Sequence, residues 1–147
     1  MKLLENVSSK KKWFVFFITY CGIIVWMTLL NRPVATRQYE LRPFWAIQEI
    51  VSGNPEGFED ATLYLKNILL FVPFGFFLTV LFEGEGKKVL MCGFTASVLI
   101  ELTQYITAVG LAELDDLTAN IIGAGFGVLL WKVGKKMMDN HQKTLRE

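Results

Sequence analysis

Some charged side chains of this sequence stand inside long apolar stretches, where an ion is costly. Glu101 is the clearest case, because it is the one charged residue between Val89 and Val109. A carboxylate near the middle of a bilayer costs about 2.5–3.5 kcal/mol on insertion scales, so it needs a partner, a cavity or a proton. Glu101 could therefore bind a polar headgroup or a cation, or exchange a proton. The alternative is a structural hydrogen bond, for example from neutral Glu101 to Asn120.

Two sets of residues are spaced by three or four positions, which places each set on one face of a helix. The sets are Gly93, Ser97, Glu101 and Gln104, and Asp116, Asn120, Gly123 and Gly127. An antiparallel pairing of the two helices predicts four contacts. They are Gln104 with Asp116, Glu101 with Asn120, Ser97 with Gly123, and Gly93 with Gly127. The small residues would let the two backbones approach in the inner half.

We expect the polar residues to meet at one level, under the outer headgroups. The candidate ligand-binding residues are Lys66, Asn67, Glu101, Gln104, Asp116, Asn120, Arg32 and Arg42. Lys and Arg would meet phosphate, and the carboxylate and amides would bond sugar or amide groups. Structural alternatives remain open, since Asn often joins membrane helices and Lys66 could extend to the interface.

The catalytic residue is not identified, and Glu101, as a general base, is the candidate. Asp115 and Asp116 are candidate ligands for a divalent cation, or they simply cap the helix that follows. No other cofactor is expected. The sequence has no P-loop and no dinucleotide fingerprint, and Ser97 has no histidine near it. This pattern favours binding over catalysis and leaves an enzyme as an alternative.

Four apolar stretches of about bilayer length must position these residues. They cover residues 13–30, 63–82, 89–109 and 117–133. Because backbone polar groups in lipid must be satisfied within the segment, we predict an all-α polytopic membrane protein with four transmembrane helices.

The composition agrees with a membrane protein and excludes other classes. Hydrophobic residues make up 52% of the 147 and charged residues 20%, which excludes a disordered chain. The net charge of +1 gives no field for nucleic acid, and one His with two Cys cannot form a His/Cys zinc cage.

Most Lys and Arg residues lie in 1–12, in the turn after residue 82 and in 134–147, whereas the loop 31–62 holds three Arg. The positive-inside rule therefore predicts a multi-pass protein of the bacterial cytoplasmic membrane with a cytoplasmic N-terminus (1–12) and a cytoplasmic polar tail (134–147). Residues 13–133 form the membrane domain. Within the first outer loop, Leu41–Val51 predicts a short interfacial or re-entrant helix, with Pro43 in its first turn.

Three motifs occur in order within residues 13–133. They are LRPFWAI at 41–47, LKNILLFVPFGFFL at 65–78 and IELTQYITAVGLAELDDLTANIIGAGFG at 100–127. As a set they resemble the NLxPF, NxxxFxPxGF and IExxQ…DxxxNxxGxxxG segments of the VanZ-like family. The sequence departs from that family at Leu111, where members often have Arg. If that Arg grips phosphate in relatives, this chain must use Lys66, Arg32 or Arg42, or function differently.

The resemblance implies a role in resistance to lipidated glycopeptides such as teicoplanin, or another envelope function, without a mechanism. Three hypotheses follow. The chain binds an amphiphile or envelope-lipid headgroup, acts as an enzyme on a lipid-linked phosphate or glycolipid, or is a scaffold for a larger envelope enzyme. The expected partners are membrane lipids, with a lipidated glycopeptide or a lipid-linked cell-wall precursor as the ligand. The oligomeric state is not predicted.

Overall fold

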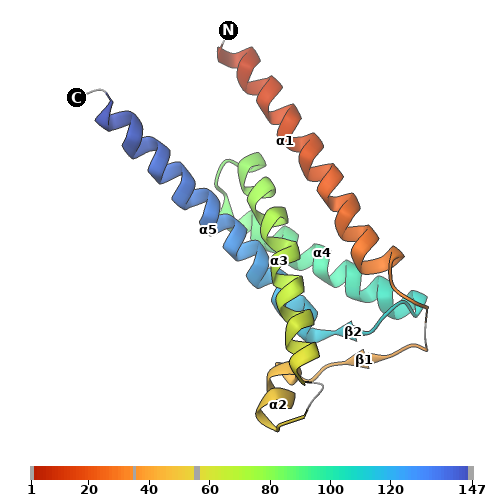
Figure 1. Cartoon of the computed structure of the whole chain (residues 1–147). Helices are drawn as coiled ribbons and strands as arrows, with labels where there is room; N and C mark the ends of the chain where they lie inside the picture. Colours follow the sequence, from red (N-terminus) through yellow and green to blue (C-terminus); the bar gives the residue numbers. More distant parts are fainter. Residues whose placement is uncertain (1, 35, 55–56, 146–147) are drawn as a thin grey trace.

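The computed structural model describes residues 2–34, 36–54 and 57–145. Four long helices dominate it: α1 (Lys2–Val25), α3 (Gly57–Leu81), α4 (Gly86–Thr107) and α5 (Leu114–Thr144) (Figure 1). One π-helical turn, η1 (Trp26–Leu30), extends α1. Four of the described helical segments are long and apolar enough to cross a membrane: Ser9–Leu30, Gly57–Leu81, Gly86–Thr107 and Leu114–Thr144. The predicted all-α fold with four spans is confirmed.

The helices extend beyond the apolar stretches that predict them. The fourth stretch covers residues 117–133, whereas α5 begins at Leu114 and continues through the polar residues to Thr144. A helix satisfies its own backbone hydrogen bonds in either solvent, so it need not end where the apolar residues end. α3 likewise begins at Gly57, before the apolar stretch 63–82, and it passes through Pro73 to Leu81.

α3 and α5 approach each other backbone to backbone. A Cβ atom added to Gly123 would lie 2.2 Å from the Ile68 carbonyl oxygen, and one added to Gly127 would lie 2.3 Å from the Val72 carbonyl oxygen. From the other side, a Cβ atom on Gly75 would lie 2.2 Å from the Ala124 carbonyl oxygen. Glycine is therefore required at these positions for this packing.

The predicted glycine contact between α4 and α5 is wrong. Gly123 and Gly127 face α3, and Gly93 of α4 lies against the Ala124 side chain. Gly75 of α3 lies against the backbone of Ala124, whereas Gly93 of α4 lies against its side chain, so the closest backbone contact of α5 is with α3. The α4–α5 pairing is consequently shifted by almost one helical turn from the expected one.

The first loop folds over the end of the bundle that lies opposite the two termini (Figure 1). It contains β1 (Tyr39–Glu40), which pairs in parallel with β2 (Ala112–Glu113), and α2 (Trp45–Val51). The short helix predicted within Leu41–Val51 is present. Pro43 lies outside it, because Phe44 at the N-cap adopts a left-handed φ of 55°. The strands, at two residues each, are too short for an alternating pattern to predict.

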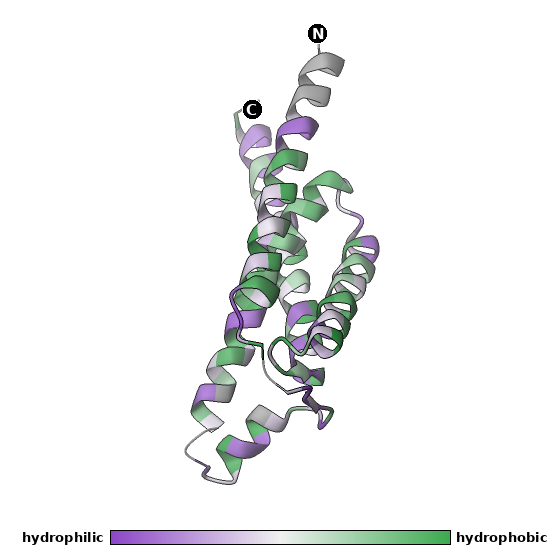
Figure 2. Ribbon diagram, turned by 90° about the vertical axis from the view of Figure 1, so that its right-hand side faces the viewer, coloured by the Kyte–Doolittle hydropathy of each residue, from purple (hydrophilic) through white to green (hydrophobic). Residues whose placement is uncertain are grey.

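Aromatic and aliphatic side chains of α1, α3, α4 and α5 form the core, including Ile24, Phe71, Phe74, Val89 and Val128. Many further large apolar side chains on the long helices are exposed, among them Phe14, Leu69, Met91, Phe94 and Leu130. Figure 2 shows the same helices coloured mostly as hydrophobic, with hydrophilic residues near both ends. Side chains of this kind on the outside of a bundle are expected in lipid.

We predict that Gly123→Ala destabilises the bundle, because its Cβ would meet the α3 backbone, which cannot move without separating the helices. The expected loss is about 1–3 kcal/mol, as for other overpacked sites. Thermal unfolding of the purified protein in detergent measures it. Gly134→Ala is the matched control, since nothing lies within 4 Å of a Cβ atom there. An equal loss in both variants would contradict the α3–α5 contact.

Candidate functional site

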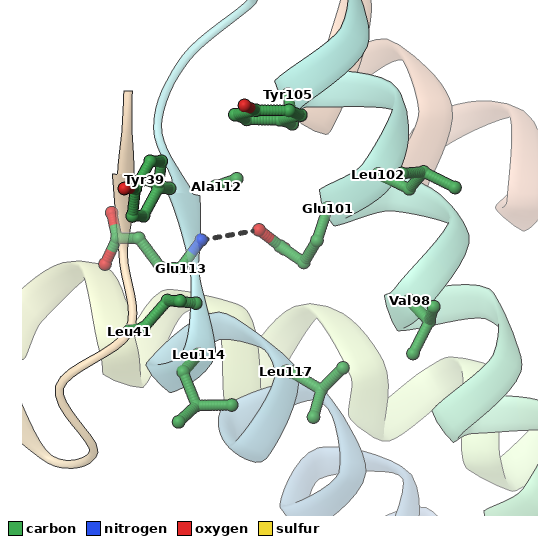
Figure 3. A pocket seen from close by; sticks show the side chains of 10 residues that line it. All are labelled: Tyr39, Leu41, Val98, Glu101, Leu102, Tyr105, Ala112, Glu113, Leu114 and Leu117. Atoms are coloured by element: carbon green, nitrogen blue, oxygen red, sulfur yellow. Dashed lines mark hydrogen bonds between the residues drawn. The ribbon is translucent and has the colours of Figure 1, made fainter. Parts of the chain in front are cut away.

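A pocket of about 420 Å³ lies between α4, the two strands and the start of α5 (Figure 3). Its walls are mainly apolar, and they carry two acidic residues and two tyrosines. The lining residues are Tyr39, Leu41, Val98, Glu101, Leu102, Tyr105, Ala112, Glu113, Leu114 and Leu117. Aliphatic walls with a few polar groups are typical of sites that bind small ligands.

Glu101 projects from α4 toward β2. Its Oε2 accepts a hydrogen bond of 2.8 Å from the backbone N–H of Glu113, drawn as a dashed line in Figure 3. The strand pairing makes this donor available: the Ala112 N–H donates to the Gln38 carbonyl, and successive N–H groups of a strand point to opposite sides. The expected partner, Asn120, instead donates from Nδ2 to Ser97 Oγ at 2.8 Å.

The two buried amides join helices and leave acceptors without donors. Gln104 was expected beside Asp116, but its Nε2 donates to the Thr28 carbonyl of η1 at 3.1 Å. Among the described residues, the Gln104 Oε1 and Asn120 Oδ1 atoms are buried without a hydrogen-bond partner. This polar layer therefore has too few hydrogen-bond donors for its acceptors, and each buried acceptor without a donor costs free energy.

Further carboxylates lie where α5 begins. Asp115 and Asp116 are both buried, with 2% and 6% of their surface exposed. Asp115 Oδ1 accepts the backbone N–H of Phe44 at 2.5 Å, and Asp116 interacts with the Asn67 side chain of α3. These two contacts tie the first loop and α3 to the first turn of α5.

Arg32 supplies positive charge beside these acids. It interacts electrostatically with Glu101, Glu113 and Asp116. Its side chain lies on Gly110, where an added Cβ atom would be 3.0 Å from Arg32 Cδ. Arg32 is therefore placed as a counter-charge to the carboxylates.

Two of the candidate cations lie away from this site. Lys66 is exposed and lines a surface groove with Phe58, Glu59, Thr62 and Leu63. Arg42 pairs with Glu40 at 2.8 Å and with Glu49 at 3.9 Å. The structure thus brings together Arg32, Asn67, Glu101 and Asp116. Gln104 and Asn120 lie one turn along the same two helices and bond other partners, and Lys66 and Arg42 lie on other surfaces.

The described residues do not form a cage for a divalent cation. No group of three or more His, Cys, Asp or Glu residues among them could hold a metal ion. Asp115, one of the two candidate ligands, is already engaged with the Phe44 backbone.

Several residues at the site are missed by sequence reasoning. Glu113 contributes through its backbone, which no residue type signals, and its carboxylate accepts a hydrogen bond of 3.1 Å from Trp45 Nε1. Tyr39 and Tyr105, whose ring centroids are 6.1 Å apart, meet only because the strands pair. The 12-residue separation of Glu101 and Glu113 within one motif is the one available clue.

Glu113 lies outside the spans, and its surroundings favour its neutral form. Burial, and then the negative charge of Asp116, raise the pKa of Glu113 to about 7 from its ordinary value of 4.5, against the opposing effects of Trp45 and Arg32. The folded state therefore binds more protons than the unfolded chain between these values. The stability that the neutral group contributes is fully present below about pH 4.5 and is lost as the pH rises through 7.

We predict that Glu113→Gln makes thermal stability less dependent on pH. The wild-type midpoint should fall between pH 5 and pH 8 more than that of the variant, because Gln stays neutral across the range. Melting curves of both proteins in the same detergent give the difference. An equal change of the melting midpoint with pH in both proteins would contradict a raised pKa at Glu113.

Comparisons with known proteins agree with the motifs in the sequence. The family model described as VanZ/LLP1 matches residues 17–135. Protein VanZ of Enterococcus faecium is 30% identical over 82 residues, which cover 55% of this chain and 50% of that protein, so the chain spans about half the length of this relative. No solved structure matches. Because the family model covers most of the chain, including every described residue of the pocket, this protein belongs to the VanZ/LLP1 family.

Proposed function

We propose that this chain binds the polar headgroup of an amphiphile in the Glu101 pocket and thereby contributes to resistance to lipidated glycopeptides such as teicoplanin. The observation that carries the proposal is a carboxylate on the wall of an otherwise mainly apolar pocket of about 420 Å³. Membership of the VanZ/LLP1 family supports the link to resistance.

The lining suits a molecule that enters from the bilayer. Leu41, Leu102 and Tyr39 line the pocket and are all more than half exposed on its outer side. Apolar side chains that face lipid do not oppose the entry of an acyl chain. A headgroup that can pair with the Glu101 carboxylate would be stabilised in the pocket. The headgroup would contact Glu101, and the chain would lie along Leu102 and Leu117.

The proposal also fixes an orientation in the bacterial cytoplasmic membrane. Both termini would be cytoplasmic and the strands would face the outside, as the distribution of Lys and Arg predicts. The end of the bundle with both termini lies opposite α2 and the strands, which supports placing the two termini on one side of the membrane and the strands on the other (Figure 1). The pocket would then open in the outer leaflet, where an antibiotic arrives.

We predict that a membrane-impermeant maleimide labels Gln38→Cys in intact cells and does not label Lys136→Cys until the cells are opened. Both positions are exposed, so a difference in labelling reports the side of the membrane. The native Cys21 and Cys92, both partly buried in helices, are removed first. Labelling of Lys136→Cys in intact cells would reverse the orientation.

We predict that Glu101→Gln abolishes the teicoplanin resistance that the wild-type chain confers on a susceptible bacterial host. The substitution keeps the shape and an oxygen acceptor for the Glu113 N–H, and it removes the charge that would pair with a headgroup. The minimum inhibitory concentration should fall to that of the empty vector while the amount of protein in the membrane is unchanged.

Glu85→Gln is the matched control, because Glu85 precedes the other end of the same helix and is exposed. It should keep wild-type resistance. A Glu101→Gln variant that is present and still fully protective would contradict a role for the pocket. Loss of the protein from the membrane would instead assign Glu101 a structural role.

A further inference from the structure

The pocket has negative but no positive side chains among the described residues that line it. Glu101 and Glu113 lie there, whereas Lys66 and Arg42 are on other surfaces. Arg32 is nearby, but Glu101, Glu113 and Asp116 share it. An anionic headgroup would therefore meet the partly buried Glu101 carboxylate, and like charges repel more strongly there than in water.

Glu101 has unused capacity to accept hydrogen bonds. A carboxylate accepts about four hydrogen bonds, and Glu101 has one from the Glu113 backbone. None of the ion pairs in the described part of the chain includes Glu101. The unpartnered oxygens of Gln104 and Asn120, which are nine-tenths or more buried, extend the shortage of donors into the adjacent layer.

Aromatic rings complete the pocket wall beside Glu101. Tyr105 follows Glu101 by one turn of α4 (Figure 3). The ring of Tyr39 packs edge to face against the ring of Tyr105, with an angle of 67° between the ring planes. The face of a tyrosine ring attracts a cation, and the attraction strengthens where water is excluded. A carboxylate beside two aromatic rings, within aliphatic walls, therefore favours an alkylammonium group over a neutral or anionic one.

We infer that the headgroup recognised by this pocket carries a protonated amine, which pairs with Glu101 and lies against Tyr39 and Tyr105. This inference rests on the proposed function, because it names the chemical class of the amphiphile. The ammonium supplies up to three hydrogen-bond donors to a site that lacks them, and its charge stabilises the ionised form of Glu101. An amine of an envelope lipid and an amine of an amphiphilic antibiotic share this chemistry.

The test uses the purified 147-residue chain in nanodiscs of phosphatidylglycerol, a lipid without an amine. The probe is dodecylamine with a photoreactive diazirine in its chain, and mass spectrometry maps the labelled peptides. We expect saturable labelling around Leu102 and Leu117. Unlabelled dodecylamine should compete at a concentration at least about tenfold lower than N-dodecylacetamide or dodecyl phosphate, as a charge-assisted hydrogen bond implies.

Variants then assign the effect to the proposed residues. Glu101→Gln should weaken competition by dodecylamine by at least about tenfold and leave competition by N-dodecylacetamide unchanged. Tyr105→Leu should weaken competition by dodecylamine by a few fold. Tyr105→Phe keeps the ring and should not weaken it. Glu85→Gln is the control, because it removes the same charge at the other end of α4. The competition on the wild-type chain needs no variant, so a misfolded variant does not affect it.

Two further competitions identify the source of the amine. Phosphatidylethanolamine is compared with its N-acetylated form, and teicoplanin is compared with its N-acetylated form. The source whose acetylation abolishes competition is the one recognised. Competition by either free amine supports the inference.

The failures are distinguishable. Equal competition by dodecylamine and N-dodecylacetamide, or stronger competition by dodecyl phosphate, would contradict the inference that the headgroup carries an amine. The proposed site for an amphiphile headgroup would remain. Absence of saturable labelling, together with unchanged resistance in Glu101→Gln, would overturn both the amine and the proposed function.

Discussion

The hydrogen bond between Glu101 and the backbone N–H of Glu113 determines how the end of the molecule that holds the two strands is arranged. A carboxylate in an apolar span must be satisfied, and here the donor comes from the peptide chain between α4 and α5. That chain can present its N–H because β1 holds the other side of β2. β1, which ends 61 residues before Glu101 in the sequence, is thereby required for the environment of one acid in the third span.

The middle of the bundle depends on a different constraint, the backbone contact of α3 with α5. Gly123, Gly127 and Gly75 allow that contact, so α5 places its small residues against α3. α4 is left to meet α5 through Ser97 and Asn120, one turn away from the expected pairing. This shift moves Glu101 out of reach of its expected amide partner and beside β2, where the pocket forms. The close packing of glycines therefore decides where the acid is located.

The sequence predicted the features that depend on composition and periodicity. Four apolar stretches of bilayer length predict four helices, and the spacing of Glu101, Gln104, Asp116 and Asn120 places them near one level. It did not predict pairings, because a 3.6-residue period identifies the face of a helix but not its neighbour. Gly123 illustrates the limit: its type predicts a close contact, and α3 and α4 both offered one. The phosphate-binding interpretation relied on Lys66, Arg32 and Arg42. Lys66 and Arg42 lie on other surfaces, and Arg32 lies beside the carboxylates. Glu113 was missed as a partner because its contribution is a backbone N–H.

The proposed binding requires that a headgroup can reach Glu101 in the pocket. A structure of the protein determined in a lipid nanodisc with a long-chain alkylamine tests this access directly. We expect density for a headgroup within hydrogen-bonding distance of Glu101, beside Tyr105, with its chain along Leu102 and Leu117. A pocket filled by the protein's own side chains, with the Glu101 carboxylate closed off from any added molecule, would contradict it.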